Sequence, residues 1–282
     1  MVRKSFASFV LSAGLALLFS WPAESHAQER PLNQRVIQSG HSLTDGIFEP
    51  LRAMVRYAGS PTVVIDKSTI PGSPMEMRWE QAPGYGQPDA KSDIANYDTL
   101  VLTERVPLSS TLPWHNSIEQ SLLWFENSWE NGNQGKGAET ILYATWVDID
   151  SGPNTQFPWN DPEKFTPFRE RLDLEMVRWQ SMLDYTNENR PAGSPEMRMI
   201  PGPLLMAAIY DEIEAGNAPG LDDFSDLFED MIHLNALGNY YIALAHFAVI
   251  YGRDPRGMQN MGGATPEQAR FMQDLVWKVL SE

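Results

Sequence analysis

The chain has 282 residues, no cysteine and a formal net charge of −16. The lack of cysteine excludes disulfides, thiol catalysis and thiolate metal sites, and the negative charge argues against nucleic acid, whose phosphates are bound by clustered Lys and Arg. A chain of this length buries ~70–75% of its unfolded surface as one domain, so its core alone can stabilise it.

The first predicted element is an export signal over residues 1–27. Basic residues precede an apolar run over 6–19, and a small-x-small cleavage signal ends at Ala27. The run is too short and too soon followed by polar residues for a membrane anchor, although an uncleaved anchor is the alternative. We therefore expect an exported protein, periplasmic or secreted. Its mature part, 28–282, should form one catalytic domain without stable membrane insertion.

Beyond the signal, short apolar runs alternate with longer segments of helical period, which is typical of a parallel sheet covered by helices on both faces. The predicted strands lie at 34–39, 62–69, 98–103, 139–146 and 197–201. The predicted helices lie at 43–58, 117–130, 167–188, 203–215, 234–251 and 265–281. This pattern predicts a doubly wound, mainly parallel, five-stranded α/β fold.

Three connections are longer than such a fold needs, at 70–97, 104–116 and 147–166. They are rich in Pro, Gly and aromatic residues, and loops at the carboxyl edge of a sheet usually carry function. The third contains Asp148-Ile149-Asp150-Ser151-Gly152, which resembles part of a calcium loop. It lacks the third acidic position and the distal glutamate, so an acidic surface loop is the favoured interpretation.

The first predicted strand runs into Gly40-His41-Ser42-Leu43, which delivers a serine to the start of a helix. This position lies at the carboxyl edge of an α/β sheet, where such sheets place their ligands. The backbone N–H groups at a helix N-terminus also point outward unpaired. Ser42 is therefore a candidate nucleophile, and the alternative is that it merely caps the helix.

A serine nucleophile needs a base, and Asp230-Met231-Ile232-His233 offers one before the predicted helix at 234–251. In a turn, positions i and i+3 share a face. Asp230 can then accept the Nδ1–H of His233 and leave Nε2 free to take a proton. The alternative is that Asp230 caps the helix and that His233 only lies on it.

The other histidines of the mature chain are weaker candidates. His41 adjoins Ser42, and adjacent residues at a turn point apart, so we do not expect it to be the base. His115 lies in a loop with no acidic neighbour closer than Glu119, and could be a surface or substrate-binding group. His246 falls in an apolar helical segment, and we expect it to be packed or partly exposed there.

The two motifs together, Gly40-His41-Ser42-Leu43 and Asp230-x-x-His233, resemble the SGNH (GDSL-type) hydrolases. The resemblance implies a flavodoxin-like, three-layer α/β/α fold, with Ser42 as nucleophile, His233 as base and Asp230 as the acid that orients it. Gly72, just after the second predicted strand, matches the glycine whose N–H completes an oxyanion hole with that of Ser42. The matches occur in the family's order across nearly the whole mature domain.

Two positions depart from the family pattern. His41 stands where the family has aspartate, which affects the support of the turn rather than the proton transfers. The segment 102–107 lacks the glycine and the asparagine of the family's third motif, and that asparagine donates to the oxyanion. Arg105 and Asn116 are candidate replacements, because an ionised Glu104 cannot donate; the alternative is two backbone donors alone. The departure indicates a specialised subfamily or an inactive relative.

We expect the activity of a serine esterase that removes acyl groups from a carbohydrate or related polymer. The expected acyl group is acetyl. We expect the substrate to be a small-molecule or polysaccharide ester and the reaction to require no metal or organic cofactor. Activity should fall on the acid side as His233 is protonated. The alternatives are a lipid esterase or an O-acyltransferase with the same triad, and a catalytically silent carbohydrate-binding protein.

Overall fold

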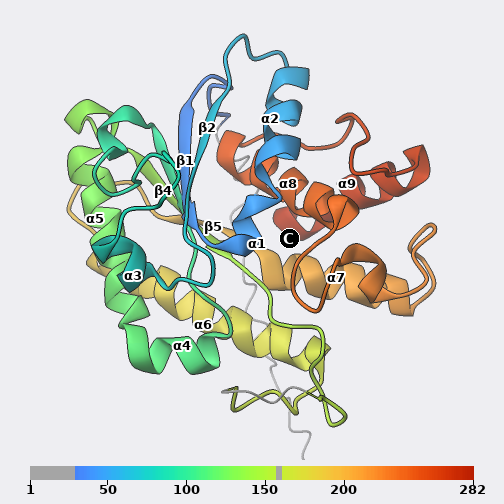
Figure 1. The fold of residues 1–282 in the computed structure, drawn as a ribbon. Helices are drawn as coiled ribbons and strands as arrows, with labels where there is room; N and C mark the ends of the chain where they lie inside the picture. Colours follow the sequence, from blue (N-terminus) through green and yellow to red (C-terminus); the bar gives the residue numbers. More distant parts are fainter. Residues whose placement is uncertain (1–28, 157–160) are drawn as a thin grey trace, which may run out of the picture.

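The computed structural model describes residues 29–156 and 161–282, and its centre is a five-stranded sheet (Figure 1). The strands are β1 (Arg35–Gly40), β2 (Val64–Thr69), β3 (Thr99–Leu102), β4 (Glu139–Ala144) and β5 (Arg198–Pro201). All neighbours pair in parallel, in the order β2-β1-β3-β4-β5, which is the flavodoxin-like, doubly wound order. The predicted fold class is confirmed, whereas the predicted signal over 1–27 lies outside the described residues.

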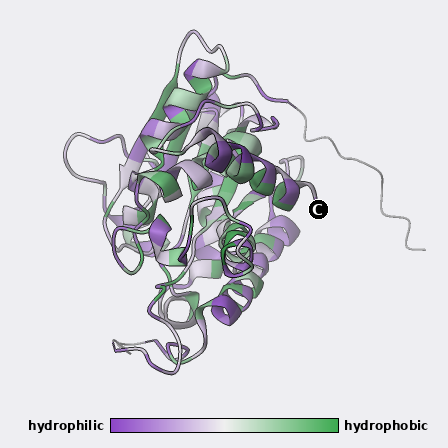
Figure 2. Cartoon of the chain, turned by 90° about the vertical axis from the view of Figure 1, so that its right-hand side faces the viewer, coloured by the Kyte–Doolittle hydropathy of each residue, from purple (hydrophilic) through white to green (hydrophobic). Residues whose placement is uncertain are grey.

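The strands carry buried apolar side chains on both faces of the sheet because helices cover both faces. Successive side chains point to opposite faces, so Val36 enters one hydrophobic cluster and Ile37 the other. In β3, Val101 faces the first cluster, while Leu100 and Leu102 face the second. Figure 2 shows the apolar residues gathered between the layers and the hydrophilic residues on the outer helices.

Two groups of helices make the outer layers (Figure 1). The first cluster is covered by α1 (Ser42–Asp45), α2 (Phe48–Tyr57), α7 (Gly202–Glu214), α8 (Ala236–Tyr251) and α9 (Pro266–Ser281). The opposite side carries α3 (Met75–Glu80), α4 (Leu108–His115), α5 (Ser117–Gly135) and α6 (Phe168–Asn189). Short 3₁₀ turns occupy Ile94–Asn96 and Phe224–Leu227. No helix in 29–156 or 161–282 is long and apolar enough to cross a membrane.

The helix prediction is wrong at three places. The helix predicted over 43–58 is interrupted between α1 and α2, where Gly46 packs so closely on α8 that an added Cβ would lie 2.3 Å from the amide nitrogen of Asn239. The short helices α3 and α4 were not predicted. Their N-cap residues are Pro74 and Pro107, and neither supplies a capping side chain.

Gly40, the last residue of β1, permits the close approach that turns the chain into α1. A Cβ at this position would lie 2.1 Å from Thr44 Oγ1 and 3.3 Å from Thr103 Cγ2. Thr44 and Thr103 are both buried, so neither has room to withdraw. The glycine therefore sets the position at which Ser42 emerges.

Gly40→Ala is expected to lower the free energy of unfolding by about 1–3 kcal/mol, because the added methyl group overpacks the start of α1. Urea denaturation measures the loss. Gly84→Ala is the matched control, since a Cβ at Gly84 meets nothing within 4 Å, and its effect should stay within about 0.5 kcal/mol. Equal stability of the two variants would contradict the close approach at Gly40.

Candidate active site

Ser42 is the first residue of α1, directly after the turn that ends β1. The N-cap of this helix is His41, which has extended backbone and accepts the Leu43 N–H on its ring, with 3.4 Å between the nitrogens. The alternative that Ser42 itself caps the helix is therefore wrong. Its hydroxyl is left available for another partner.

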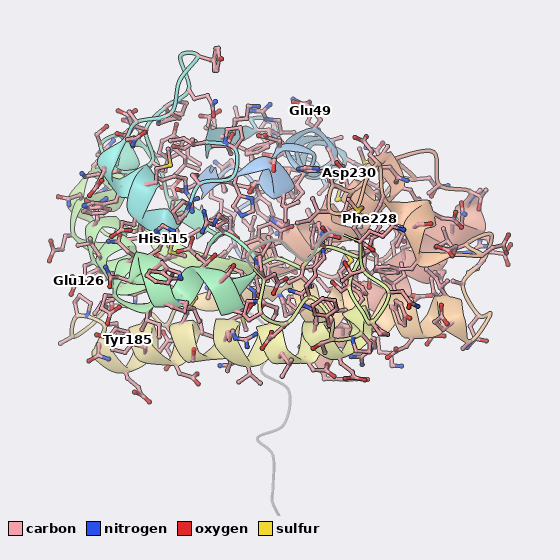
Figure 3. The ribbon with its side chains drawn as sticks, turned by 60° about the horizontal axis from the view of Figure 1, so that its bottom comes forward. Glu49, His115, Glu126, Tyr185, Phe228 and Asp230 are labelled. Atoms are coloured by element: carbon pink, nitrogen blue, oxygen red, sulfur yellow. The ribbon has the colours of Figure 1, made fainter. Side chains whose placement is uncertain are left out.

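Asp230 and His233 lie on the loop between the Phe224–Leu227 turn and α8, where Figure 3 labels Asp230. One carboxylate oxygen, Asp230 Oδ1, accepts the backbone N–H groups of Ile232 at 2.8 Å and His233 at 2.7 Å. The other oxygen lies 2.7 Å from His233 Nδ1. α8 begins later and is capped by Asn235, so Asp230 organises the turn that carries His233 rather than capping α8.

The other ring nitrogen, His233 Nε2, lies 2.9 Å from Ser42 Oγ. The structure thus brings Asp230, His233 and Ser42, predicted together from the sequence, into one hydrogen-bonded series. If Nδ1 carries the proton donated to Asp230, Nε2 is free to accept the proton of the serine hydroxyl. This is the arrangement that activates a serine.

Asp230 is held in its ionised form. Partial burial opposes ionisation, but the N–H groups of His233 and Ile232 outweigh it and lower the pKa of Asp230 to about 2. A carboxylate that keeps its charge can stabilise the imidazolium that forms when His233 accepts a proton.

Residues at the exit of β4 hold the Asp230–His233 turn in place. Trp146 Nε1 donates to the carbonyl oxygen of Ile232 at 2.9 Å, and the Ile149 N–H donates to that of Met231 at 2.8 Å. The 147–166 connection therefore contacts the site, as its length suggested. The fourth predicted strand ends at residue 146, but nothing in the sequence indicated the contact between Trp146 and the histidine turn.

The acidic stretch that resembled a calcium loop is part of this connection. Asp148 pairs with Lys164 at 3.0 Å, and Asp150 accepts a hydrogen bond from Thr155. Within the described ranges, no group of three or more His, Asp or Glu residues could hold a metal ion. These contacts favour the acidic surface loop.

Gly72 lies in a turn that starts beside the end of β1. The Ile70 N–H donates to the carbonyl oxygen of Gly40 at 3.1 Å, and the Ser73 N–H closes the turn onto Ile70 at 3.2 Å. Gly72 has φ +65, which glycine adopts without strain at the third position of such a turn. The Gly72 position is thus compatible with the oxyanion role that the family resemblance implies, and that role stays a prediction.

Arg78, on α3, makes hydrogen bonds to three segments at the carboxyl edge of the sheet. Its guanidinium is buried and donates to Ser39 Oγ at 3.1 Å, Ser73 Oγ at 3.0 Å and the carbonyl oxygen of Thr103. Burial lowers the pKa of Arg78 to about 10 despite the opposing effect of Glu104, and the group is still charged at neutral pH.

Glu104 lies in the segment where the family resemblance implies a motif that contains an oxyanion donor. Its side chain is buried, and its Oε1 accepts the N–H of Met75 at 3.0 Å and that of Arg105 at 2.6 Å. Burial raises the pKa of Glu104, and the nearby Arg78 opposes that rise. Glu104 Oε1 therefore caps α3 as a hydrogen-bond acceptor, and Glu104 does not supply the missing oxyanion donor.

His41 supports the serine turn with both ring nitrogens. Nδ1 accepts from Leu43, so Nε2 carries the proton and donates to the carbonyl oxygen of Glu104 at 2.9 Å. Burial, helped by the charge of Arg78, lowers the pKa of His41 to about 4. A neutral, fully engaged imidazole cannot serve as the base for Ser42.

Two further histidines differ in their surroundings. His246 is buried in α8, where its Nδ1 donates to the carbonyl oxygen of Ile242 at 3.0 Å. His115 lies between Arg105, 3.2 Å from its Nε2, and Glu76, 3.1 Å from its Nδ1. No sequence signal pointed to Glu76, because it belongs to the unpredicted helix α3.

Comparison with known proteins finds similarity in fold and no match in sequence. No family model and no curated protein matches the chain. Among solved structures, it is similar to a DUF4886 family protein from Bacteroides uniformis ATCC 8492, with a TM-score of 0.64 and 16% sequence identity. The match covers 88% of this chain and 94% of that protein. It supports the three-layer fold and carries no information about activity.

The neutral state of His41 should make stability depend on pH. The folded chain holds this imidazole unprotonated down to about pH 4, whereas an unfolded histidine takes up its proton near 6.5. Between these values the unfolded state binds more protons, so the free energy of unfolding should fall as the pH drops, by up to about 3 kcal/mol.

The variant His41→Asn isolates this contribution, because asparagine can cap α1 but does not titrate. We expect the difference in unfolding free energy between wild type and variant to be constant above pH 6.5. Between pH 6.5 and about 4, the wild type should lose unfolding free energy relative to the variant. Urea denaturation across this range measures it, and a pH-independent difference would show that His41 is not held neutral.

Proposed function

We propose that this protein is a serine esterase that removes acyl groups, in the first instance acetyl, from a carbohydrate or related polymer. The observation that carries the proposal is the series Asp230–His233–Ser42, with contacts of 2.7 and 2.9 Å. These residues belong to segments far apart in the chain, and helix capping explains neither the Ser42–His233 contact nor its alignment with Asp230. Activation of the serine hydroxyl explains both.

In the proposed reaction, Ser42 Oγ attacks the ester carbonyl while His233 Nε2 takes the hydroxyl proton. Asp230 stabilises the resulting imidazolium through Nδ1. The N–H groups of Ser42 and Gly72 bind the oxyanion of the tetrahedral intermediate. His233 then gives its proton to the departing alcohol, and the same steps with water release the acid from the acyl-enzyme.

The exposure of the site favours a small acyl group on a large alcohol. The side chains of His233 and Asp230 are 39% and 55% exposed, and Met231 between them is also exposed. A long acyl chain would need an apolar cavity to cover it, whereas an open site admits a polymer. Trp114, 78% exposed on α4, offers the kind of flat ring on which a sugar stacks. Export, proposed from the leader sequence, would give access to such a polymer.

Ser42→Ala is expected to abolish hydrolysis of acetyl esters and covalent labelling by a fluorophosphonate, because both need the activated hydroxyl. Ser181→Ala is the matched control: Ser181 is an exposed residue of α6, and its loss should leave both signals unchanged. Undiminished turnover by Ser42→Ala would refute the proposal. A wild-type protein that is never labelled, yet binds glycans, would favour the carbohydrate-binding alternative.

Asp230→Asn should lower kcat by about 10⁴-fold while folding stability changes little. The asparagine oxygen can still accept the two backbone N–H groups, but its amide would face Nδ1 and force the proton onto Nε2. His233 would then point a donor, not an acceptor, at Ser42. Steady-state kinetics on an acetyl ester, with urea denaturation as the stability control, test this. A kcat within tenfold of wild type would contradict the orienting role.

Acyl preference and acceptor use separate the related activities. Acetyl and long-chain aryl esters, each assayed with and without an alcohol acceptor, distinguish an acetylesterase from a lipid esterase and from an acyltransferase. We expect the acetyl ester to be preferred and water to be the acceptor.

A further inference from the structure

Arg105 follows β3 at the carboxyl edge of the sheet, where the chain passes close to the turn that carries Ser42. The parallel register pairs Ser39 of β1 with Leu102 of β3, and the Thr103 N–H continues it by donating to Ser39 at 3.2 Å. His41 Nε2 donates to the Glu104 carbonyl oxygen at 2.9 Å, so the residues that directly precede Ser42 and Arg105 are in contact. Arg105 therefore leaves β3 next to the turn that carries Ser42.

The guanidinium of Arg105 is held in one orientation by His115 and Thr111. Its Nη2 lies 3.2 Å from His115 Nε2, and its Nε donates to Thr111 Oγ1 at 3.4 Å. Because arginine can only donate, His115 Nε2 must accept, so its Nδ1–H donates to Glu76 at 3.1 Å. This fixes the histidine tautomer and, through it, the arginine.

Arg105 also keeps unused hydrogen-bonding capacity. Within the part of the chain that the structure describes, no carboxylate pairs with its guanidinium and its Nη1 makes no hydrogen bond. In a chain with a net charge of −16, a half-buried arginine without an acidic partner is notable. Figure 3 labels His115, on α4, and Asp230 on the same face of the molecule.

We propose that Arg105 donates a hydrogen bond to the oxyanion that forms when Ser42 attacks an ester, and that His115 and Glu76 position it. This rests on the proposed esterase function. The charge that develops on the carbonyl oxygen has the sign that a guanidinium binds, and a charged donor makes a stronger hydrogen bond than an amide. The donor acts in addition to the N–H groups of Ser42 and Gly72. Its neighbours are arranged before the substrate arrives, so little reorganisation is needed.

Replacement of Arg105 tests the proposal. Arg105→Ala should lower kcat by about 10²–10³-fold with little change in KM, because the bond is made only in the transition state. Arg105→Lys, which keeps a charge but not the forked geometry, should lose less. Added guanidinium ion should restore part of the activity of Arg105→Ala and none of that of Ser42→Ala. The matched control is Arg270→Gln, an exposed residue of α9, which should behave as wild type.

The positioning residues give a separate readout. His115→Phe removes the acceptor that holds Nη2 and should lower kcat about tenfold. His115→Gln restores an acceptor oxygen and should recover part of the loss. A purely structural role for His115 would instead lower the stability of both variants without this difference in kcat. Urea denaturation of each variant records that stability.

The outcomes separate this inference from the function on which it rests. If Ser42→Ala is inactive while Arg105→Ala keeps a wild-type kcat, the esterase function stands and the role of Arg105 is refuted. If Ser42→Ala is fully active, both fail. Should Arg105→Ala not fold, Arg105→Lys decides: a wild-type kcat or a change in KM alone refutes the proposal, and a lower kcat at unchanged KM supports it.

Discussion

The geometry of this site depends on one buried cation. The guanidinium of Arg78 bonds to the end of β1 through Ser39, to the Gly72 turn through Ser73, and to the exit of β3 through Thr103. These segments supply Ser42, Gly72 and Arg105. Removing one partner from such a buried charged network costs about 3–5 kcal/mol in other proteins, because the remaining groups lose their compensation. The edge of the sheet is therefore fixed as a unit, with Glu104 as the nearby opposite charge.

Two buried glutamates extend this organisation to the neighbouring helices. Glu104 accepts the first N–H of α3, and Glu175 of α6 accepts the Leu108 N–H of α4 at 2.8 Å. Both helices begin after a proline that offers no capping side chain, so a carboxylate from elsewhere in the chain does the capping. This explains why the sequence predicts the strands and long helices but not α3 or α4. The carboxylates that cap them lie 29 and 67 residues away in the sequence from the helix starts.

The same distinction between local and distant information applies to the site. Ser42 could be identified as a candidate nucleophile because a strand end, a glycine and a helix start are adjacent in the chain. Asp230 and His233 could be identified as its candidate partners because only two residues separate them. By contrast, the partner of His115 could not be predicted, since Glu76 is 39 residues earlier and on a helix without a sequence signature. The hydrogen bond from Trp146 to the histidine turn, 86 residues apart, was hidden for the same reason.

The turn from Asp230 to His233 has a consequence for how this chain can vary. One carboxylate oxygen is satisfied by N–H groups of the turn itself and the other by the imidazole, so four consecutive residues encode both the charge and the orientation of the ring. Outside contacts such as that of Trp146 only anchor the unit. Substitutions around this unit should therefore leave the orientation of the ring unchanged as long as the anchoring contacts remain.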